Sequence, residues 1–164
     1  MAFAQQNPHE NIVAIERTTT KSCKASNLVA RVRTISPEAG LKNLGMFQDD
    51  ALNWVAHHVQ HPCLKGIFIL YPNPYPKPSQ RNKRFHFMPF MKALVDGLLP
   101  SATLTIATND PRYFLETLAV LPQYFELELD SKRVCDPRNA ARSNFEELFF
   151  QRQVLCYEAV FRRL

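Results

Sequence analysis

Glycine is scarce in this chain, which has four glycines among 164 residues, at positions 40, 45, 66 and 97. None of them belongs to a Gly-x-Gly-x-x-Gly pattern, whose small residues let the backbone approach a phosphate or a nucleoside closely. A Gly-x-Ser-x-Gly pattern, which presents a nucleophilic serine in many hydrolases, is also absent. The sequence therefore contains neither a glycine-rich nucleotide loop nor a hydrolase nucleophile motif.

Long apolar runs and closely paired cysteines are absent as well. No apolar stretch approaches the roughly 20 residues that a membrane-spanning helix needs, and the first residues have neither a basic flank nor an apolar signal core. No two of the four cysteines have two residues between them, as in a zinc knuckle or a redox motif. We therefore expect a cytoplasmic protein with reduced thiols, no membrane association and no metal site.

The composition is ordinary for a globular protein, with 46% hydrophobic and 21% charged residues. The length predicts one domain spanning residues 1–164. The formal net charge is +5, with 20 Lys and Arg against 15 Asp and Glu. A modest positive charge favours a polyanionic partner only weakly, so the positions of the cations matter more than their sum.

Segments with strand character alternate with segments of helical character. Strands are expected at 11–16, 43–48, 66–71, 102–107, 125–129 and 155–161. Helices are expected at 21–35, directly after Asp49 or Asp50, at 88–99 and at 111–121. This alternation is typical of an α/β domain with a mostly parallel sheet. The last two strands have no clear helix between them, so we expect an antiparallel pair at one edge.

Polar side chains follow three of the expected strands. Glu16 follows the first, Asp49 and Asp50 follow the second, and Asn73 follows the third. In open α/β sheets, ligands bind beyond the carboxyl ends of the strands, where a carboxylate can accept hydrogen bonds from both hydroxyls of a ribose. Each residue also has a simpler interpretation, because Glu16 can be merely solvated and Asp50 can be a helix cap.

A proline-rich loop and a basic run come next. Residues 72–78 contain four prolines, which remove backbone donors and stiffen the segment. Such a loop is suited to holding a planar base, with Tyr71 and Tyr75 available for stacking, or it is only a stiff connection. Residues 77–84 then carry four cations followed by an aromatic residue, a combination found both in RNA-binding segments and in solvated loops.

Taken in order, these segments resemble the tRNA (guanine-N(7)) methyltransferase family. Residues 71–77 and 83–84 are similar to the family's Phe-Pro-Asp-Pro-Trp motif and the basic stretch after it. Residues 107–110 resemble its Thr-Asp segment, and residues 143–146 resemble its Thr-x-x-Glu motif. Ile15-Glu16 and residues 48–51 resemble its acidic strand end and its Asp-Ala step. Five weak matches in the family's order cover almost the whole chain.

The resemblance implies a Rossmann-like class I methyltransferase fold and methyl transfer from S-adenosylmethionine to N(7) of a tRNA guanine. By position, Glu16 would hold the cofactor ribose, Asp50 would meet the adenine, and Asn73 would lie at the methyl donor as the catalytic residue. Substrate positions would be Lys77, Asn109, Ser143, Asn144, Phe145 and Glu146. The tRNA phosphates would contact Arg81, Lys83 and Arg84.

The sequence departs from the family in two respects. Family members begin with a strand and a glycine-rich loop, so we expect a fold whose first strand is missing. Either the two neighbouring strands pair directly, or another chain fills the gap, as in a homodimer, or the protein starts upstream. The motif acids are replaced by Asn73 and Asn109, which keep hydrogen-bonding capacity but lose the charge. Two alternatives to catalysis therefore stay open: a degenerate homologue or fragment that only binds RNA, and a remnant that folds poorly.

Overall fold

The computed structural model of the chain describes residues 2–35, 41–139 and 141–164. The chain divides into two compact units, Met1–His58 and Val59–Leu164. The single domain expected from the length stays a prediction.

The first unit is built on two parallel strands, β1 (Ile12–Ile15) and β2 (Leu44–Phe47). Its helices are α1 (Ala2–Gln6), α2 (Thr19–Ile35) and α3 (Ala51–His58), with a short 3-10 turn η2 (Leu41–Asn43) before β2. Ala4, Val29, Leu41 and Leu44 form its buried cluster. This small apolar core is supplemented by polar contacts, because the Arg33 guanidinium donates to the carbonyls of Leu41 and Leu44, each from Nη2 at 2.7 Å.

The second unit is a four-stranded sheet in the order β3-β4-β6-β5. Its strands are β3 (Leu64–Leu70), β4 (Leu98–Thr108), β5 (Leu127–Val134) and β6 (Tyr157–Arg163). β3 and β4 are parallel, whereas β6 runs antiparallel to both of its neighbours. Leu104, Ile106, Ala159 and Phe161 are fully buried. The core of this unit therefore lies on the two central strands.

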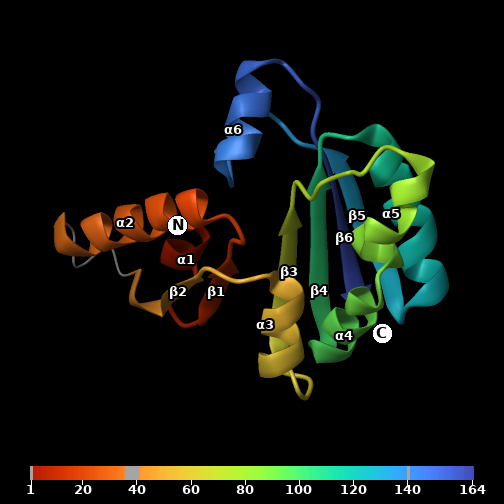
Figure 1. The fold of residues 1–164 in the computed structure, drawn as a ribbon, viewed down its shortest axis with the longest axis horizontal. Coiled ribbons are helices and arrows are strands. Elements are labelled where there is room, and N and C mark those ends of the chain that lie inside the picture. The colour runs from red at the N-terminus through yellow and green to blue at the C-terminus, as the bar shows by residue number, and fades with distance from the viewer. Residues whose placement is uncertain (1, 36–40, 140) are drawn as a thin grey trace. The chain divides into compact units, whose positions relative to one another are not determined.

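Helices α4 (Pro89–Gly97) and α5 (Pro111–Tyr124) pack against this sheet (Figure 1). The 3-10 turns η3 (Pro78–Lys83) and η4 (Phe85–Phe87) lead into α4. A third helix, α6 (Asn144–Gln151), lies beyond the end of the sheet toward which β3 points (Figure 1). The polar residues that follow β3 and β4 therefore lie at the same end of this unit as α6.

The α/β class and the antiparallel edge pair are confirmed, since β5 and β6 pair antiparallel with β5 at the edge. The expectation that no helix separates these two strands is wrong, because α6 lies between them. Helix α6 has eight residues, as does α3, which the sequence did predict, so length alone does not explain the miss. The N-cap of α6 carries a local signal that could have revealed it: Ser143 Oγ accepts from the amide of Glu146, as in a Ser-x-x-Glu capping box.

Substituting Gly97, at the end of α4, is expected to destabilise the second unit. A Cβ atom there would overlap Val59 Cγ1 and lie 3.3 Å from Leu64 Cδ1. Because the neighbours are packed side chains, we expect Gly97→Ala to lower the free energy of unfolding by about 1–3 kcal/mol in urea titrations. Gly66→Ala is the matched control, since its Cβ would be no closer than 3.7 Å to Thr103 Oγ1. Equal stability of the two variants would contradict the packing argument.

Candidate active site

Glu16 and Asp50 lie at one edge of the first unit. Strands β1 and β2 are parallel with Ile15 opposite Phe47, so the residues after each strand emerge at the same edge. The Glu16 amide continues the pairing by donating to the Phe47 carbonyl at 3.0 Å. The sequence prediction that these two acids follow neighbouring strand ends is confirmed, and the structure brings them to a common edge.

The two carboxylates are only partly used by the protein. Glu16 Oε1 accepts from the Thr18 amide at 2.7 Å, and its Oε2 has no partner among the residues that the structure describes. Asp50 Oδ1 accepts from the Leu52 amide at 2.9 Å and so caps α3, while Oδ2 lies 3.8 Å from Arg17 Nη1. The cap interpretation of Asp50 therefore holds, and Glu16 keeps an oxygen available for a hydroxyl donor.

In the second unit, the proline loop begins where β3 ends. Tyr71 and Tyr75 both have left-handed backbone conformations, with φ of 54° and 43°. Asn73 lies between them, exposed, and its Oδ1 accepts from the Tyr75 amide at 3.1 Å. Non-glycine residues with positive φ persist only where surrounding contacts hold them. The loop is therefore a constrained structure that side chains from other elements must hold in place.

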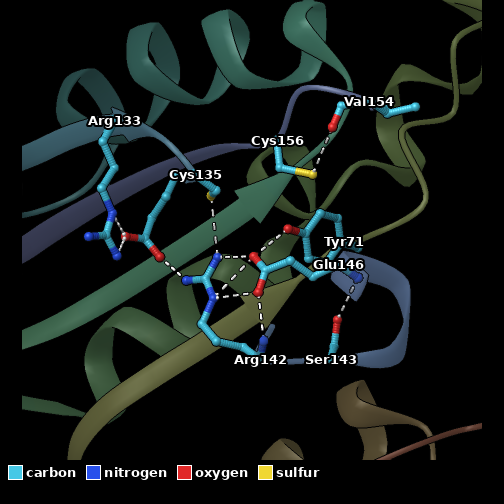
Figure 2. Close-up of polar contacts among 9 residues, drawn as sticks. Tyr71, Arg133, Cys135, Arg142, Ser143, Glu146, Val154 and Cys156 are labelled. Atoms are coloured by element: carbon cyan, nitrogen blue, oxygen red, sulfur yellow. Dashed lines mark hydrogen bonds and ion pairs between the residues drawn. The ribbon is translucent and has the colours of Figure 1, made fainter. Parts of the chain in front are cut away.

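The first anchor is the side chain of Tyr71. Its hydroxyl donates to Glu146 Oε1 at 2.5 Å (Figure 2). Its ring packs on Phe149 with centroids 5.4 Å apart. Both partners belong to α6, so this helix holds the start of the proline loop. Glu146 was predicted as a substrate residue, and the structure shows it buried with both carboxylate oxygens occupied by protein donors.

Arg142 lies at the centre of the ion network around Glu146. Its Nε atom is 3.1–3.2 Å from the two Glu146 oxygens, and its Nη2 and Nη1 atoms pair with Glu146 and Glu158 respectively (Figure 2). Arg133 pairs with the other Glu158 oxygen at 2.7 Å. Glu146 and Glu158 have side chains only 2% and 6% exposed. One guanidinium therefore contacts two buried carboxylates, from α6 and β6, and Arg133 supplies the second positive charge of the network.

The network controls the ionisation of its members. Burial by itself raises the pKa of Glu146, but hydrogen bonds from Arg142 and Tyr71 outweigh it and lower the pKa to about 2. Burial, reinforced by the hydrogen bond to Glu146, raises the pKa of the Tyr71 hydroxyl well above its usual range. Glu146 is therefore ionised and Tyr71 is neutral at physiological pH, which fixes the tyrosine as the donor.

The second anchor is Arg84, which was predicted to contact RNA. Its guanidinium donates to the Tyr75 carbonyl at 2.9 and 3.2 Å and to Glu116 Oε2 at 2.5 Å. Its side chain is 15% exposed, against 58% for Arg81. Arg84 therefore holds the far end of the proline loop, while Arg81 and the exposed Lys83 present charge to solvent.

The remaining predicted substrate positions lie near the same strand ends. Lys77 is exposed and precedes η3 without capping it. Asn109 is half-buried directly after β4, next to Asp110, whose Oδ1 caps α5 by accepting from the amides of Arg112 and Tyr113 at 2.9 Å. Because Leu70 pairs with Ala107 in parallel register, the proline loop and Asn109 emerge at one edge. Asn144 and Phe145 are exposed on α6, the latter stacked against Phe149.

Sequence reasoning missed the residues that hold these loops in place. They are Arg142, Glu158, Arg133, Glu116 and His86. Only the pair at positions 142 and 146, four residues apart, has a local signal. Within the described ranges, no group of three His, Cys, Asp or Glu side chains is placed to hold a metal, and no helix is long and apolar enough to cross a bilayer.

Comparison with known sequences gives a family match. The family described as "Putative methyltransferase" matches residues 1–159. A tRNA (guanine-N(7)-)-methyltransferase of Chlamydia abortus is 26% identical over 150 residues, covering 91% of this chain and 64% of the relative. One from Alkalilimnicola ehrlichii is 30% identical over 116 residues, covering 70% of this chain and 47% of the relative. The chain thus spans less than two thirds of the length of these relatives.

Comparison with solved structures gives the fold. An antibiotic-related methyltransferase superposes with a TM-score of 0.73 at 14% identity, covering 98% of this chain and 80% of that one. The 16S rRNA methyltransferase KamB gives a TM-score of 0.69 at 15% identity, with 99% and 80% coverage. These similarities confirm the class I methyltransferase fold that was predicted from the sequence.

Proposed function

This chain belongs to that methyltransferase family, and from this premise we propose that it transfers the methyl group of S-adenosylmethionine to N(7) of a guanine in tRNA. The similarity to relatives named for this activity supports the proposal. The observation that carries it is the constrained proline loop, which presents Asn73 at the edge where Asn109 also emerges. A fixed loop at strand ends suits a reaction that depends mainly on alignment.

The residues of the first unit fit the cofactor. Glu16 Oε2, which no described protein group contacts, is available to accept from the ribose hydroxyls. Asp50 lies at the same edge, at the start of α3, in the position proposed for the adenine. When bound, S-adenosylmethionine supplies a methyl group activated by its sulfonium. The protein's task is then to bind and orient its two substrates, because the chemistry belongs to the cofactor.

The residues of the second unit are proposed to place the guanine. Its N(7) already has a free lone pair, so no general base is needed to create the nucleophile. Asn73 Nδ2 is a donor without a partner among the described residues, and Asn109 offers a second amide at the same edge. Lys77, Arg81 and Lys83 are exposed cations suited to the tRNA phosphates. In this proposal Ser143 and Glu146 act by holding α6 and Tyr71, while Asn144 and Phe145 face the substrate.

Methylation of unmodified tRNA by the purified chain tests the proposal directly. Titration calorimetry should show saturable S-adenosylmethionine binding, and a tritium-transfer assay followed by nucleoside analysis should show 7-methylguanosine. Salt-sensitive tRNA binding without transfer would indicate the degenerate homologue that only binds RNA. If neither ligand binds to a chain that unfolds cooperatively, the proposed function is wrong.

Replacing Glu16 should weaken cofactor binding specifically. Glu16→Gln keeps an oxygen for the Thr18 amide but loses the charge, so we expect the Kd for S-adenosylmethionine to rise about tenfold. Calorimetry measures this directly. Asp130→Asn is the matched control, because Asp130 pairs with Arg162 on the exposed surface of β5 and β6, in the second unit, whereas Glu16 belongs to the first. An unchanged Kd for Glu16→Gln would remove Glu16 from the cofactor site.

A further inference from the structure

The Arg84 guanidinium has one partner in the proline loop and another on α5. It donates twice to the Tyr75 carbonyl and once to Glu116 Oε2. The Tyr75 amide in turn donates to Asn73 Oδ1, so the residue held by Arg84 is hydrogen-bonded to the proposed catalytic residue. A change in the orientation of Arg84 therefore affects Asn73 through two contacts: Arg84 with the Tyr75 carbonyl, and the Tyr75 amide with Asn73.

Glu116 is shared between Arg84 and a buried histidine. His86 Nε2 lies 2.9 Å from the same Oε2 atom that Arg84 contacts, and its side chain is 0% exposed. An ionised carboxylate only accepts hydrogen bonds, so His86 must carry a proton on Nε2. Burial lowers the pKa of His86 although Glu116 opposes that shift, which makes the neutral Nε2–H form the one expected at physiological pH.

The ionised form of Glu116 is secured by the same two donors. Partial burial raises its pKa, but hydrogen bonds from His86 and Arg84 outweigh that effect and hold the pKa below its usual range. Arg81 lies 3.6 Å from the other oxygen and stacks on the Phe87 ring at 4.0 Å. The carboxylate therefore faces three donors, of which only His86 is fully enclosed.

We propose that Glu116 and His86 are positioning residues: acting through Arg84, they fix the proline loop in the conformation that places Asn73. The left-handed backbone of Tyr75 needs such an external anchor, because nothing in its own side chain favours that conformation. The expected consequence for the rate of methyl transfer rests on the function proposed above, whereas the effect on the loop does not.

The effect of Glu116 and His86 on the proline loop can be measured without an assay of methyl transfer. Amide exchange followed by NMR would compare two amides of the same loop: Tyr75 N–H, bonded to Asn73, and Tyr71 N–H, bonded to the Ala107 carbonyl at 2.7 Å in the sheet. In Glu116→Ala, we expect Tyr75 exchange to accelerate about five- to tenfold while Tyr71 exchange stays unchanged. The Tyr71 amide thus serves as an internal control for the sheet.

A pair of His86 variants separates hydrogen bonding from packing. His86→Gln can donate to Glu116 from a similar reach, whereas His86→Leu fills a comparable volume but cannot donate. We expect the leucine variant to accelerate Tyr75 exchange as Glu116→Ala does, and the glutamine variant to stay close to the wild type. If Glu116→Ala folds poorly, the same exchange measurement is made on Glu116→Gln, which loses the charge but retains one acceptor oxygen.

The rate of methyl transfer provides a second test of the proposal. In Glu116→Ala and His86→Leu, kcat for methyl transfer should fall about 10- to 100-fold, with the Kd for S-adenosylmethionine unchanged and Asp130→Asn as the unaffected control. Unchanged Tyr75 exchange in both variants would overturn the proposal, as would a loosened loop with an unchanged kcat. If the wild-type chain transfers no methyl group, the proposed function fails, and the exchange measurement alone decides whether the positioning role holds.

Discussion

Replacing Arg142 by alanine should lower the free energy of unfolding by about 3–5 kcal/mol, because removing one partner of a buried ion pair leaves the other charge uncompensated. The substitution leaves Glu146, whose side chain is 2% exposed, without a cation, and leaves Glu158, 6% exposed, with Arg133 alone. A buried carboxylate that loses its partner must either stay charged in a poor environment or take up a proton, and both cost free energy. Urea unfolding at pH 7 measures the difference.

Arg133→Ala is the matched control for this prediction. Arg133 also pairs with Glu158, but its side chain is 65% exposed, and Glu158 keeps Arg142 when it is removed. We expect a loss of about 1 kcal/mol or less, as for other solvent-screened pairs. Adding Glu146→Gln to Arg142→Ala should recover part of the stability, because one unpaired charge is then gone. Equal effects of the two arginine substitutions would show that burial does not govern this network.

Stability at acidic pH should depend on Glu146 more than on any exposed acid. Its pKa is lowered from 4.5 to about 2 in the folded protein, so the unfolded chain binds the proton more readily. The stabilisation is therefore fully present above about pH 4.5 and is lost as pH falls toward 2. The shift corresponds to a contribution on the order of 3 kcal/mol.

Urea titrations from pH 7 down to pH 3 should show this in the difference between the wild type and Glu146→Gln. The wild type should lose stability faster below pH 4.5, because the glutamine variant has no proton to take up at this position. Asp130→Asn, which removes an acid in an exposed pair, should parallel the wild type. Parallel curves for the wild type and Glu146→Gln would mean that the folded protein does not hold Glu146 ionised.

The strands and the principal helices could be predicted from the sequence because their signals are local. The apolar run at residues 66–71 and the break at Pro72 correspond to β3 and the loop after it. Glu16 and Asp50 were predicted beyond the carboxyl ends of their strands, where open α/β sheets bind ligands. The parallel register of β1 and β2 shows that both residues lie at the same edge. Helix α6 was missed although the Ser-x-x-Glu pattern at residues 143–146 is a local signal for the start of a helix.

The contacts that hold the site could not be predicted because they join residues far apart in the chain. Tyr71 and Glu146 are separated by 75 positions, and Arg84 and Glu116 by 32. Nothing near Arg84 distinguishes it from Arg81 in the sequence, yet the Arg84 side chain is 15% exposed in the structure and that of Arg81 is 58% exposed. The basic run was therefore interpreted as one surface, whereas one of its members faces the interior.

The four prolines of residues 72–78 also reduce the number of conformations open to the unfolded chain. Ordering this loop consequently costs less conformational entropy than ordering a loop of ordinary residues, before any anchor forms. The anchors at Tyr71 and Tyr75 then need only select among few conformers rather than hold a flexible chain. Replacing the exposed Pro76 by alanine would for that reason loosen the loop without removing a single hydrogen bond or packed contact from its anchors.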